Sequence, residues 1–157
     1  MSRAAKPARN KQSFADTFRL DNHLFYYFSQ VLARRTRALN AQLRPFGLDY
    51  ARWRVLAVLN EAASMSMGRL ADLTSVDRTT LTRTLGMMQA EGLVRRAPNA
   101  TDRRGIDISL TAKGRRLLET ILPQVLAQTE RAIQGFAADE VAHLRGLLAR
   151  MVDNLKP

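Results

Sequence analysis

The chain has 157 residues, 46% of them hydrophobic, and its 25 Lys/Arg against 14 Asp/Glu give a formal net charge of +11. This length is enough for the core of one domain, and the positive charge favours an anionic partner such as nucleic acid or a membrane surface. The absence of cysteine excludes disulfides and thiol-based oxidant sensing. The two histidines, His23 and His143, are too far apart in sequence to suggest a zinc site of the usual kind.

The basic excess is concentrated near the start of the chain. Residues 1–64 contain eleven Lys/Arg against four Asp/Glu. Residues 1–13 carry basic side chains and no acidic one, and we expect a flexible basic arm there, followed by a single domain over residues 14–157. A solvated tail is one interpretation of the arm, and additional contacts to phosphates are the other.

A long amphipathic helix is predicted over residues 14–44, and Pro45 and Gly47 should end it. Its apolar positions keep helical spacing: Phe14, Phe18, Phe25, Phe28, Val31, Leu32, Leu39 and Leu43. A further helix is expected over residues 51–62.

Two short helices joined by a tight turn are predicted next. Ser66 should cap the first, Met67 to Leu73, because its hydroxyl can accept a bond from a free N–H of the first turn. Thr74-Ser75 forms the turn, and Val76 returns the chain to the core. The inward face of this helix is expected to hold Met67, Leu70, Ala71 and Leu73.

The second of these helices should begin after the N-cap Asp77, run to about Ala90 and stop at Gly92. Leu81, Leu85 and Met88 fall on one face at helical spacing. The opposite face holds Thr79, Thr82, Arg83 and Gly86, flanked by Arg78 and Gln89. Short donors with arginine suit base edges and phosphates in a major groove. The alternative is an ordinary solvated helix face.

A β-hairpin is predicted to follow. Residues 92–96 form its first strand, residues 97–104 its loop, and Ile106, Ile108 and Leu110 alternate with polar residues along the second strand. At the far end of the loop, Arg103 could reach a minor groove. Alternatively, Asp102 and Arg104 only brace the hairpin by an ion pair.

The order and spacing of these motifs resemble those of MarR-family transcriptional regulators over about residues 18–155. The stretches that carry the resemblance are residues 70–73, 76–83, 91–96, Asp102-x-Arg104 and 110–114. Ser75 departs from the family, which often has glycine in this turn. The resemblance implies a mainly α fold with a small β-hairpin wing, residues 51–111 being the winged helix-turn-helix. Its DNA-binding residues would be Ser75, Arg78, Thr79, Thr80, Thr82, Arg83, Arg95, Asp102, Arg103 and Arg104.

The last third of the chain is expected to dimerise. Thr111 should cap a helix with one apolar face (Leu117, Leu118, Ile121, Leu122, Val125 and Leu126), which Pro123 should kink or interrupt and Gly135 should end. A second seam, Val141, Leu144, Leu148, Met151 and Leu155, has coiled-coil-like spacing. With residues 14–45, residues 112–157 predict a homodimer, as the resemblance also implies. Such a dimer would bind a palindromic operator in double-stranded DNA.

Members of the family commonly bind small aromatic acids, and this sequence offers candidates for such a site. Arg19 and His23, four apart on the first predicted helix, should share a face. With Tyr26, Asp49, Tyr50 and Trp53 they could hold a hydroxybenzoate or a hydroxynicotinate. The alternative places Trp53 in the core and His23 at a dimer interface. No metal or other cofactor is expected.

These features predict a cytoplasmic, nucleoid-associated regulator, most simply a repressor of a catabolic or efflux operon that a small aromatic or heteroaromatic carboxylate releases. Activation by the same dimer stays open. A ligand-independent architectural DNA-binding protein is the main alternative, and a protein-binding module is a third. An enzyme is not expected, because no nucleophile with a nearby base and no glycine-rich phosphate loop occurs. No membrane span is predicted either.

Overall fold

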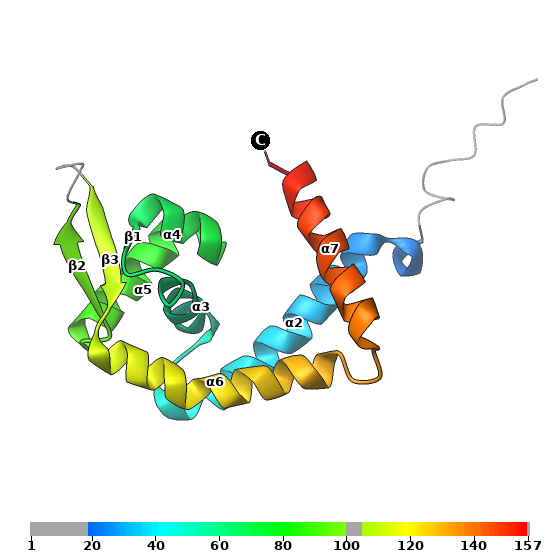
Figure 1. Ribbon diagram of the computed structural model, residues 1–157, viewed down its shortest axis with the longest axis horizontal. Coiled ribbons are helices and arrows are strands. Elements are labelled where there is room, and N and C mark those ends of the chain that lie inside the picture. Colours follow the sequence, from blue (N-terminus) through cyan, green and yellow to red (C-terminus); the bar gives the residue numbers. More distant parts are fainter. Residues whose placement is uncertain (1–18, 100–104, 157) are drawn as a thin grey trace, which may run out of the picture. The chain divides into compact units, whose positions relative to one another are not determined.

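The computed structural model describes residues 19–99 and 105–156. Contacts divide the chain into two compact units, residues 1–37 and residues 38–157. The described part is mainly helical, with one small antiparallel sheet, so the predicted fold class is confirmed (Figure 1). The elements are η1 (Leu20–Asn22), α2 (Leu24–Leu43), η2 (Arg44–Phe46), α3 (Tyr50–Leu59), β1 (Met65–Ser66), α4 (Met67–Thr74), α5 (Arg78–Ala90), β2 (Val94–Pro98), β3 (Ile106–Leu110), α6 (Ala112–Ala132) and α7 (Ala138–Asn154).

In the first unit, the predicted continuous helix is wrong at its start. The α-helix begins only at Leu24, after the short 3-10 turn η1. Asp21 lies in this turn and its carboxylate accepts two bonds from the Arg19 guanidinium. Asp and Asn side chains bond to nearby groups and so favour turns over helix interiors, which explains the late start. The predicted apolar residues Phe14 and Phe18 lie outside the described residues.

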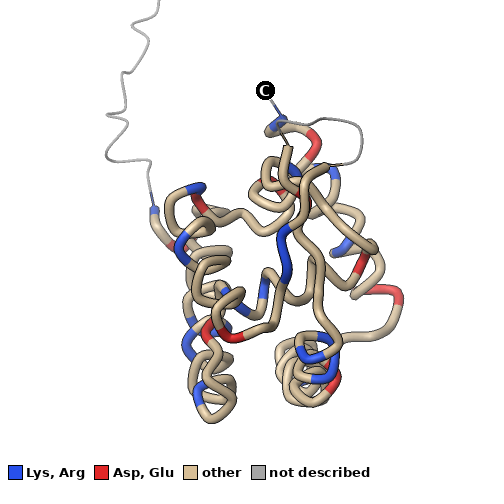
Figure 2. Tube along the Cα trace, turned by 90° about the vertical axis from the view of Figure 1, so that its left-hand side faces the viewer, with Lys and Arg blue, Asp and Glu red and all other residues tan. Residues whose placement is uncertain are grey.

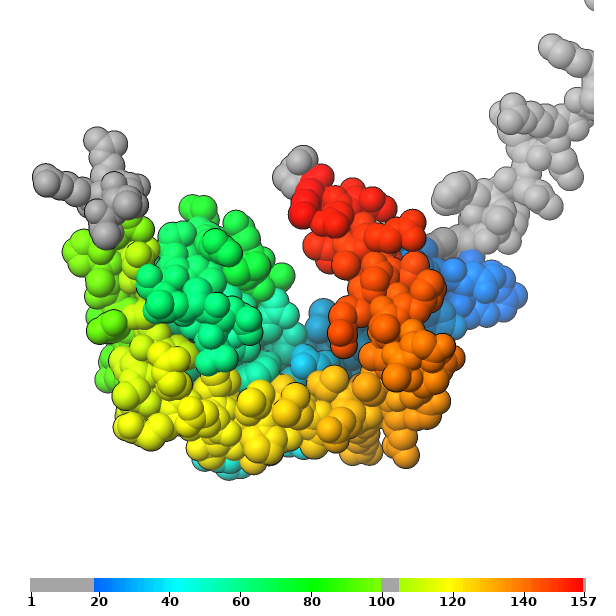
Figure 3. Space-filling view, in the orientation of Figure 1, coloured from blue at the N-terminus to red at the C-terminus, as the bar shows by residue number. Residues whose placement is uncertain are grey.

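The core of the second unit lies where α3, α4, α5 and the sheet pack together (Figures 1 and 3). The first part of α6 covers this core, since Leu118, Ile121 and Val125 are buried in it. The side chains that are fully buried at its centre include Leu43, Val55, Leu56, Leu59, Leu70, Leu81, Leu85, Met88 and Ile108. Burying each such side chain stabilises the fold by roughly 1.5–3 kcal/mol before the entropic cost of ordering it.

The sheet has three strands in the order β1–β3–β2, and β1 was not predicted. Met65 pairs with Ile108, and Val94 pairs with Leu110. The first hairpin strand begins at Val94 and continues through Pro98, so the predicted bounds were two residues too early. Ile106 is 48% exposed, contrary to prediction, because it lies at the far end of β3 opposite Pro98.

The helix α4 is capped by Ser66 as predicted, since the Ser66 hydroxyl accepts a bond from the Arg69 N–H. Its predicted inward face is partly wrong. Leu73 is 47% exposed, and Thr74 is buried in its place. Thr74 lies one turn after Leu70 and its hydroxyl donates to the Leu70 carbonyl at 2.7 Å, which satisfies the polar atom inside the core.

The helices α6 and α7 carry the apolar faces expected of the last third of the chain. Thr111 caps α6 by accepting a bond from the Gly114 N–H, and the helix continues through Pro123 to Ala132. Along α7 no residue is buried, Leu148 and Val152 are among its exposed apolar side chains, and Leu155 directly after the helix is exposed as well. Within residues 19–99 and 105–156, no helix is both long and apolar enough to cross a membrane.

Candidate nucleic-acid interface

Ser75 and Asp77, in the turn before α5, fix where this helix begins. Ser75 adopts the left-handed conformation, with φ 52° and ψ 32°, so the turn has the geometry that usually requires glycine. Asp77 then caps α5, accepting the Thr80 N–H at 2.9 Å as predicted. This bond and a second one from the Thr80 hydroxyl lower the pKa of the Asp77 carboxyl. The charged carboxylate also lies at the positive end of the helix dipole.

One face of α5 is buried and the opposite face is exposed, as predicted. Leu81, Leu85 and Met88 have no solvent exposure, and the sequence interpretation missed Thr84, which is buried beside them. The candidate DNA-binding residues of the helix lie on the exposed side: Arg78, Thr79, Thr80, Thr82 and Arg83. The helix therefore presents hydroxyls and guanidinium groups to solvent from a backbone held by apolar packing.

The exposed side chains differ in how far they are already engaged. The Thr82 hydroxyl donates to the Arg78 carbonyl at 2.7 Å, so its lone pairs stay available to a donor such as a base amino group. The Arg78 guanidinium lies near Gly68 of α4. A Cβ at position 68 would be 4.0 Å from one of its nitrogens. Arg83 has no hydrogen-bond or ion-pair partner within the described part of the chain, which leaves its five donors free.

The wing is held by polar contacts between its two strands and at the point where its loop begins. Arg95 donates through Nε to the Ser109 hydroxyl at 2.9 Å, which explains why Ser109 is buried although the strand pattern predicted it to be exposed. Asn99 donates to the Asp107 carboxylate at 2.9 Å, and its N–H donates to the Gly105 carbonyl. The predicted wing-tip residues Asp102, Arg103 and Arg104 lie outside the described residues.

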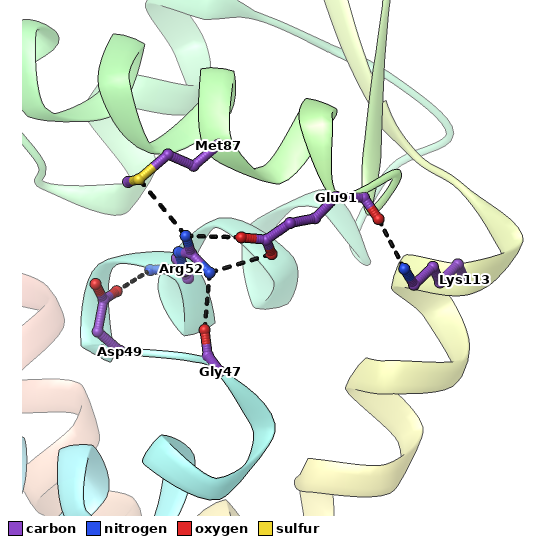
Figure 4. A network of polar contacts seen from close by, with 6 residues as sticks. All are labelled: Gly47, Asp49, Arg52, Met87, Glu91 and Lys113. Atoms are coloured by element: carbon purple, nitrogen blue, oxygen red, sulfur yellow. Dashed lines mark hydrogen bonds and ion pairs between the residues drawn. The ribbon is translucent and has the colours of Figure 1, made fainter.

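A polar network that the sequence interpretation missed anchors the other end of α5 (Figure 4). The Arg52 guanidinium donates to both carboxylate oxygens of Glu91, at 2.9 and 3.1 Å, and to the Gly47 carbonyl at 2.7 Å. Its side chain is only 13% exposed, so solvent screens the pair less than an ordinary surface ion pair. Lys113 of α6 donates to the Glu91 carbonyl at 2.8 Å. Arg52 and Glu91 are 39 positions apart, so no local spacing could have revealed this contact.

The candidate effector residues of the first unit do not have the predicted arrangement. Arg19 and His23 flank the 3-10 turn η1 and do not share an α-helical face. The Arg19 guanidinium is exposed and already bound to Asp21 at 3.0 Å, which raises the pKa of Arg19 and lowers that of Asp21. Arg19, Asp21 and the half-buried Tyr26 line an open depression of about 380 Å³.

The candidate effector residues of the second unit have evident structural roles. The Asp49 carboxylate caps α3 by accepting the Arg52 N–H at 2.8 Å. Trp53 is only 8% exposed and belongs to the core, as the alternative interpretation stated. Tyr50 is half-buried, with the Arg54 guanidinium 6.0 Å from the centre of its ring. Tyr50 packs against the core with one part of its side chain and leaves the other part in solvent.

The Lys and Arg residues are spread over several helices and the strands and do not gather on one element (Figure 2). Net charge alone therefore does not locate the DNA-binding surface. Within the described residues, no group of three or more His, Cys, Asp or Glu could hold a metal ion.

A helix pair joined by a tight turn, an exposed polar face on its second helix and an antiparallel wing define a winged helix-turn-helix protein. The family model for the MarR family matches residues 46–105, which span this region. A mutant of MarR from E. coli, solved in complex with operator DNA, is 32% identical, with a TM-score of 0.72 over 82% of this chain and 92% of that one. The chain belongs to the MarR family of DNA-binding transcriptional regulators.

Two curated relatives match most of their own length. The transcriptional repressor IacR of Pseudomonas putida is 29% identical over 98% of this chain and 94% of the relative. The transcriptional activatory protein BadR of Rhodopseudomonas palustris is 32% identical over 87% of this chain and 81% of the relative. These relatives are regulators of transcription and not enzymes.

Proposed function

We propose that this protein is a homodimeric, sequence-specific repressor of a catabolic or efflux operon, released from a palindromic operator by a small aromatic or heteroaromatic carboxylate. The observation that carries the proposal is the exposed face of α5, where Thr82 and Arg83 stand opposite fully buried leucines. Hydroxyl and guanidinium donors on a rigid helix match the donor and acceptor pattern of the major groove. We place the protein in the cytoplasm, on the nucleoid.

Apolar side chains that a single chain leaves in solvent support the homodimer. In the first unit, Phe25 and Val31 of α2 are 52% and 60% exposed. In the second unit, α7 leaves Leu144, Leu148 and Val152 exposed. Clustered exposed apolar residues mark association surfaces, and a second copy of the chain would supply the same surfaces by symmetry.

The dimer would regulate transcription through the spacing of its two α5 helices. Major grooves on one side of B-DNA recur every turn, about 34 Å apart, so both helices fit only at a matching separation. An effector that favours another separation weakens binding. A hundredfold loss requires about 2.7 kcal/mol of coupling, which lies within the usual allosteric range.

The effector would be an anion with a ring, and each unit offers a candidate contact for it. Tyr50 offers a half-buried ring. Arg19 offers a guanidinium, and a ligand carboxylate would have to replace the Asp21 carboxylate there. The effector class rests on the family resemblance.

The test is a titration of the purified protein against DNA from upstream of its own gene and against a scrambled duplex, at fixed salt. Arg83→Ala is expected to weaken specific binding by about 1–3 kcal/mol, or roughly 5–150-fold, and to relax sequence preference. Arg150→Ala removes the same charge from α7 and is the matched control. Equal losses for both variants would contradict the assignment of Arg83 to the interface.

The same titration separates the rival functions. Equal affinity for upstream and scrambled DNA would favour an architectural DNA-binding protein. Specific binding that raises transcription would favour activation. We consider this alternative because the relative BadR is named a transcriptional activatory protein. Absence of DNA binding by the wild-type protein would leave a protein-binding module.

A further inference from the structure

A hollow of about 390 Å³ lies in the second unit, where the C-terminal end of α5 meets the beginning of α6. None of the six candidate effector residues lines it. We call it the α6 hollow. It is lined by Phe46, Glu91, Leu93, Lys113, Arg116, Leu117 and Thr120. It is partly open to solvent, and its volume is large enough for a small ring with one charged group.

The polar part of the α6 hollow is net positive. Lys113 and Arg116 are three apart on α6 and so share a face. The one carboxylate in the lining, that of Glu91, is already neutralised by Arg52 at 2.9 and 3.1 Å. Arg116 is exposed and its guanidinium has no partner among residues 19–99 and 105–156. The hollow therefore offers a free bidentate donor to an anion.

The remaining part of the α6 hollow is apolar. Leu93 is buried, and Phe46 and Leu117 are half-buried against the core. An aromatic and two leucine side chains beside a free guanidinium suit a molecule with a flat apolar body and one anionic end. Inorganic phosphate would leave this apolar surface unused.

We infer that the α6 hollow binds a small carboxylate with an apolar ring and that this binding weakens the anchor of α5. The carboxylate pairs with Arg116 and Lys113, and the ring lies against Phe46 and Leu117. The inference rests on the proposed function, because it assigns a second regulatory site to the same DNA-binding helix.

The coupling runs through Lys113 and Glu91. Lys113 donates to the carbonyl of Glu91, the residue that ends α5, and Glu91 holds Arg52 of α3. A ligand carboxylate that pairs with Lys113 draws its ammonium towards the ligand and so weakens the bond to the Glu91 carbonyl, one of the bonds that fix the end of α5. By linkage, DNA that requires the fixed arrangement lowers the affinity for the ligand by the same factor.

The test is a calorimetric titration of the full-length protein with benzoate, with benzamide as the neutral isostere. Arg116→Gln is expected to weaken benzoate binding at least tenfold. Arg115→Gln removes the same charge from the neighbouring exposed residue of α6, which does not line the hollow, and is expected to change it less than twofold. Benzamide is expected to bind at least tenfold more weakly than benzoate. Thermal unfolding of each variant checks that it is folded.

Equal benzoate affinity for Arg116→Gln and wild type, or equal affinity for benzamide and benzoate, would overturn the inference. So would failure of the wild-type protein to bind benzoate at millimolar concentration. Upstream DNA added to the calorimeter cell separates this site from the proposed function. If Arg116-dependent benzoate binding persists while the DNA shows no specificity, the hollow stands and the repressor proposal falls. If DNA binding is specific but Arg116→Gln leaves its sensitivity to benzoate unchanged, the repressor proposal stands and the coupling falls.

Discussion

Gly114 lies in the first turn of α6, where this helix closely approaches the backbone of Leu93. A Cβ built on Gly114 would overlap the carbonyl oxygen of Leu93 and press on the Leu110 side chain. The Leu93 oxygen cannot move away cheaply, because it accepts the Thr111 N–H at 3.0 Å and the Thr111 hydroxyl at 3.2 Å. Substitution to alanine should therefore displace the beginning of α6 from the backbone of Leu93.

The magnitude follows from three opposing contributions. Overpacking against a fixed backbone costs about 1–3 kcal/mol, and loosening one hydrogen bond costs about 1 kcal/mol more. Replacing glycine by alanine in a helix returns about 1 kcal/mol. The net expectation for Gly114→Ala is a loss of about 1–3 kcal/mol in the free energy of unfolding, or roughly 2–12 °C in Tm.

Urea unfolding and thermal melting at fixed protein concentration would measure this loss, because the stability of a dimer depends on concentration. Gly86 of α5 provides the matched control, since a Cβ there meets nothing within 4 Å. Gly86→Ala should raise the free energy of unfolding by up to about 1 kcal/mol. If both alanines stabilised the protein alike, the close approach of α6 to the backbone of Leu93 would be refuted.

Three further predictions concern the turn, the cap and the dimer. Ser75→Gly should raise the free energy of unfolding by up to about 1 kcal/mol, since relief of the left-handed conformation exceeds the entropic cost of glycine; a lower urea midpoint would contradict this. The pKa of Asp77 is lowered by Thr80, so its contribution to stability is complete above the usual value of 3.8 and is lost as the pH falls through the lowered value. Asp77→Asn keeps the cap and should flatten the pH dependence of the urea midpoint below pH 3.8; an unchanged pH profile would refute the contribution of the Asp77 charge. Leu148→Glu should shift the sedimentation equilibrium towards monomer, and Arg150→Glu is the control. An unshifted equilibrium would show that Leu148 does not lie in the dimer interface.

Much of the fold could be predicted because its signals are local. Caps at Ser66, Asp77 and Thr111 each depend on one side chain and an N–H three residues later, and all three are confirmed. The buried face of α5 follows from helical spacing alone. Leu73 was wrongly assigned to the buried face because its side chain is apolar. Thr74 is buried instead, because its hydroxyl donates to the Leu70 carbonyl on the preceding turn.

The remaining features could not be predicted because they depend on partners distant in sequence. β1 has two residues and no pattern of its own, and it exists only because β3 lies beside it. Ser109 is buried because Arg95, on the neighbouring strand, reaches it. Arg19 and His23 were paired on the assumption of a continuous helix, and the ion pair of Arg19 with Asp21 stabilises a turn there instead.

The helix that we propose to contact DNA is held at both of its ends. At its beginning, the Asp77 cap and the left-handed Ser75 fix the first turn. At its end, Glu91 binds Arg52 of α3 and Lys113 of α6. Leu81, Leu85 and Met88 hold the middle of α5 in the core, so the polar contacts at its ends are the part of its anchoring that a ligand can reach from solvent. Regulation of DNA binding is therefore expected to act on the ends of α5, and the contact with α6 is the end that lies beside a hollow able to hold a ligand.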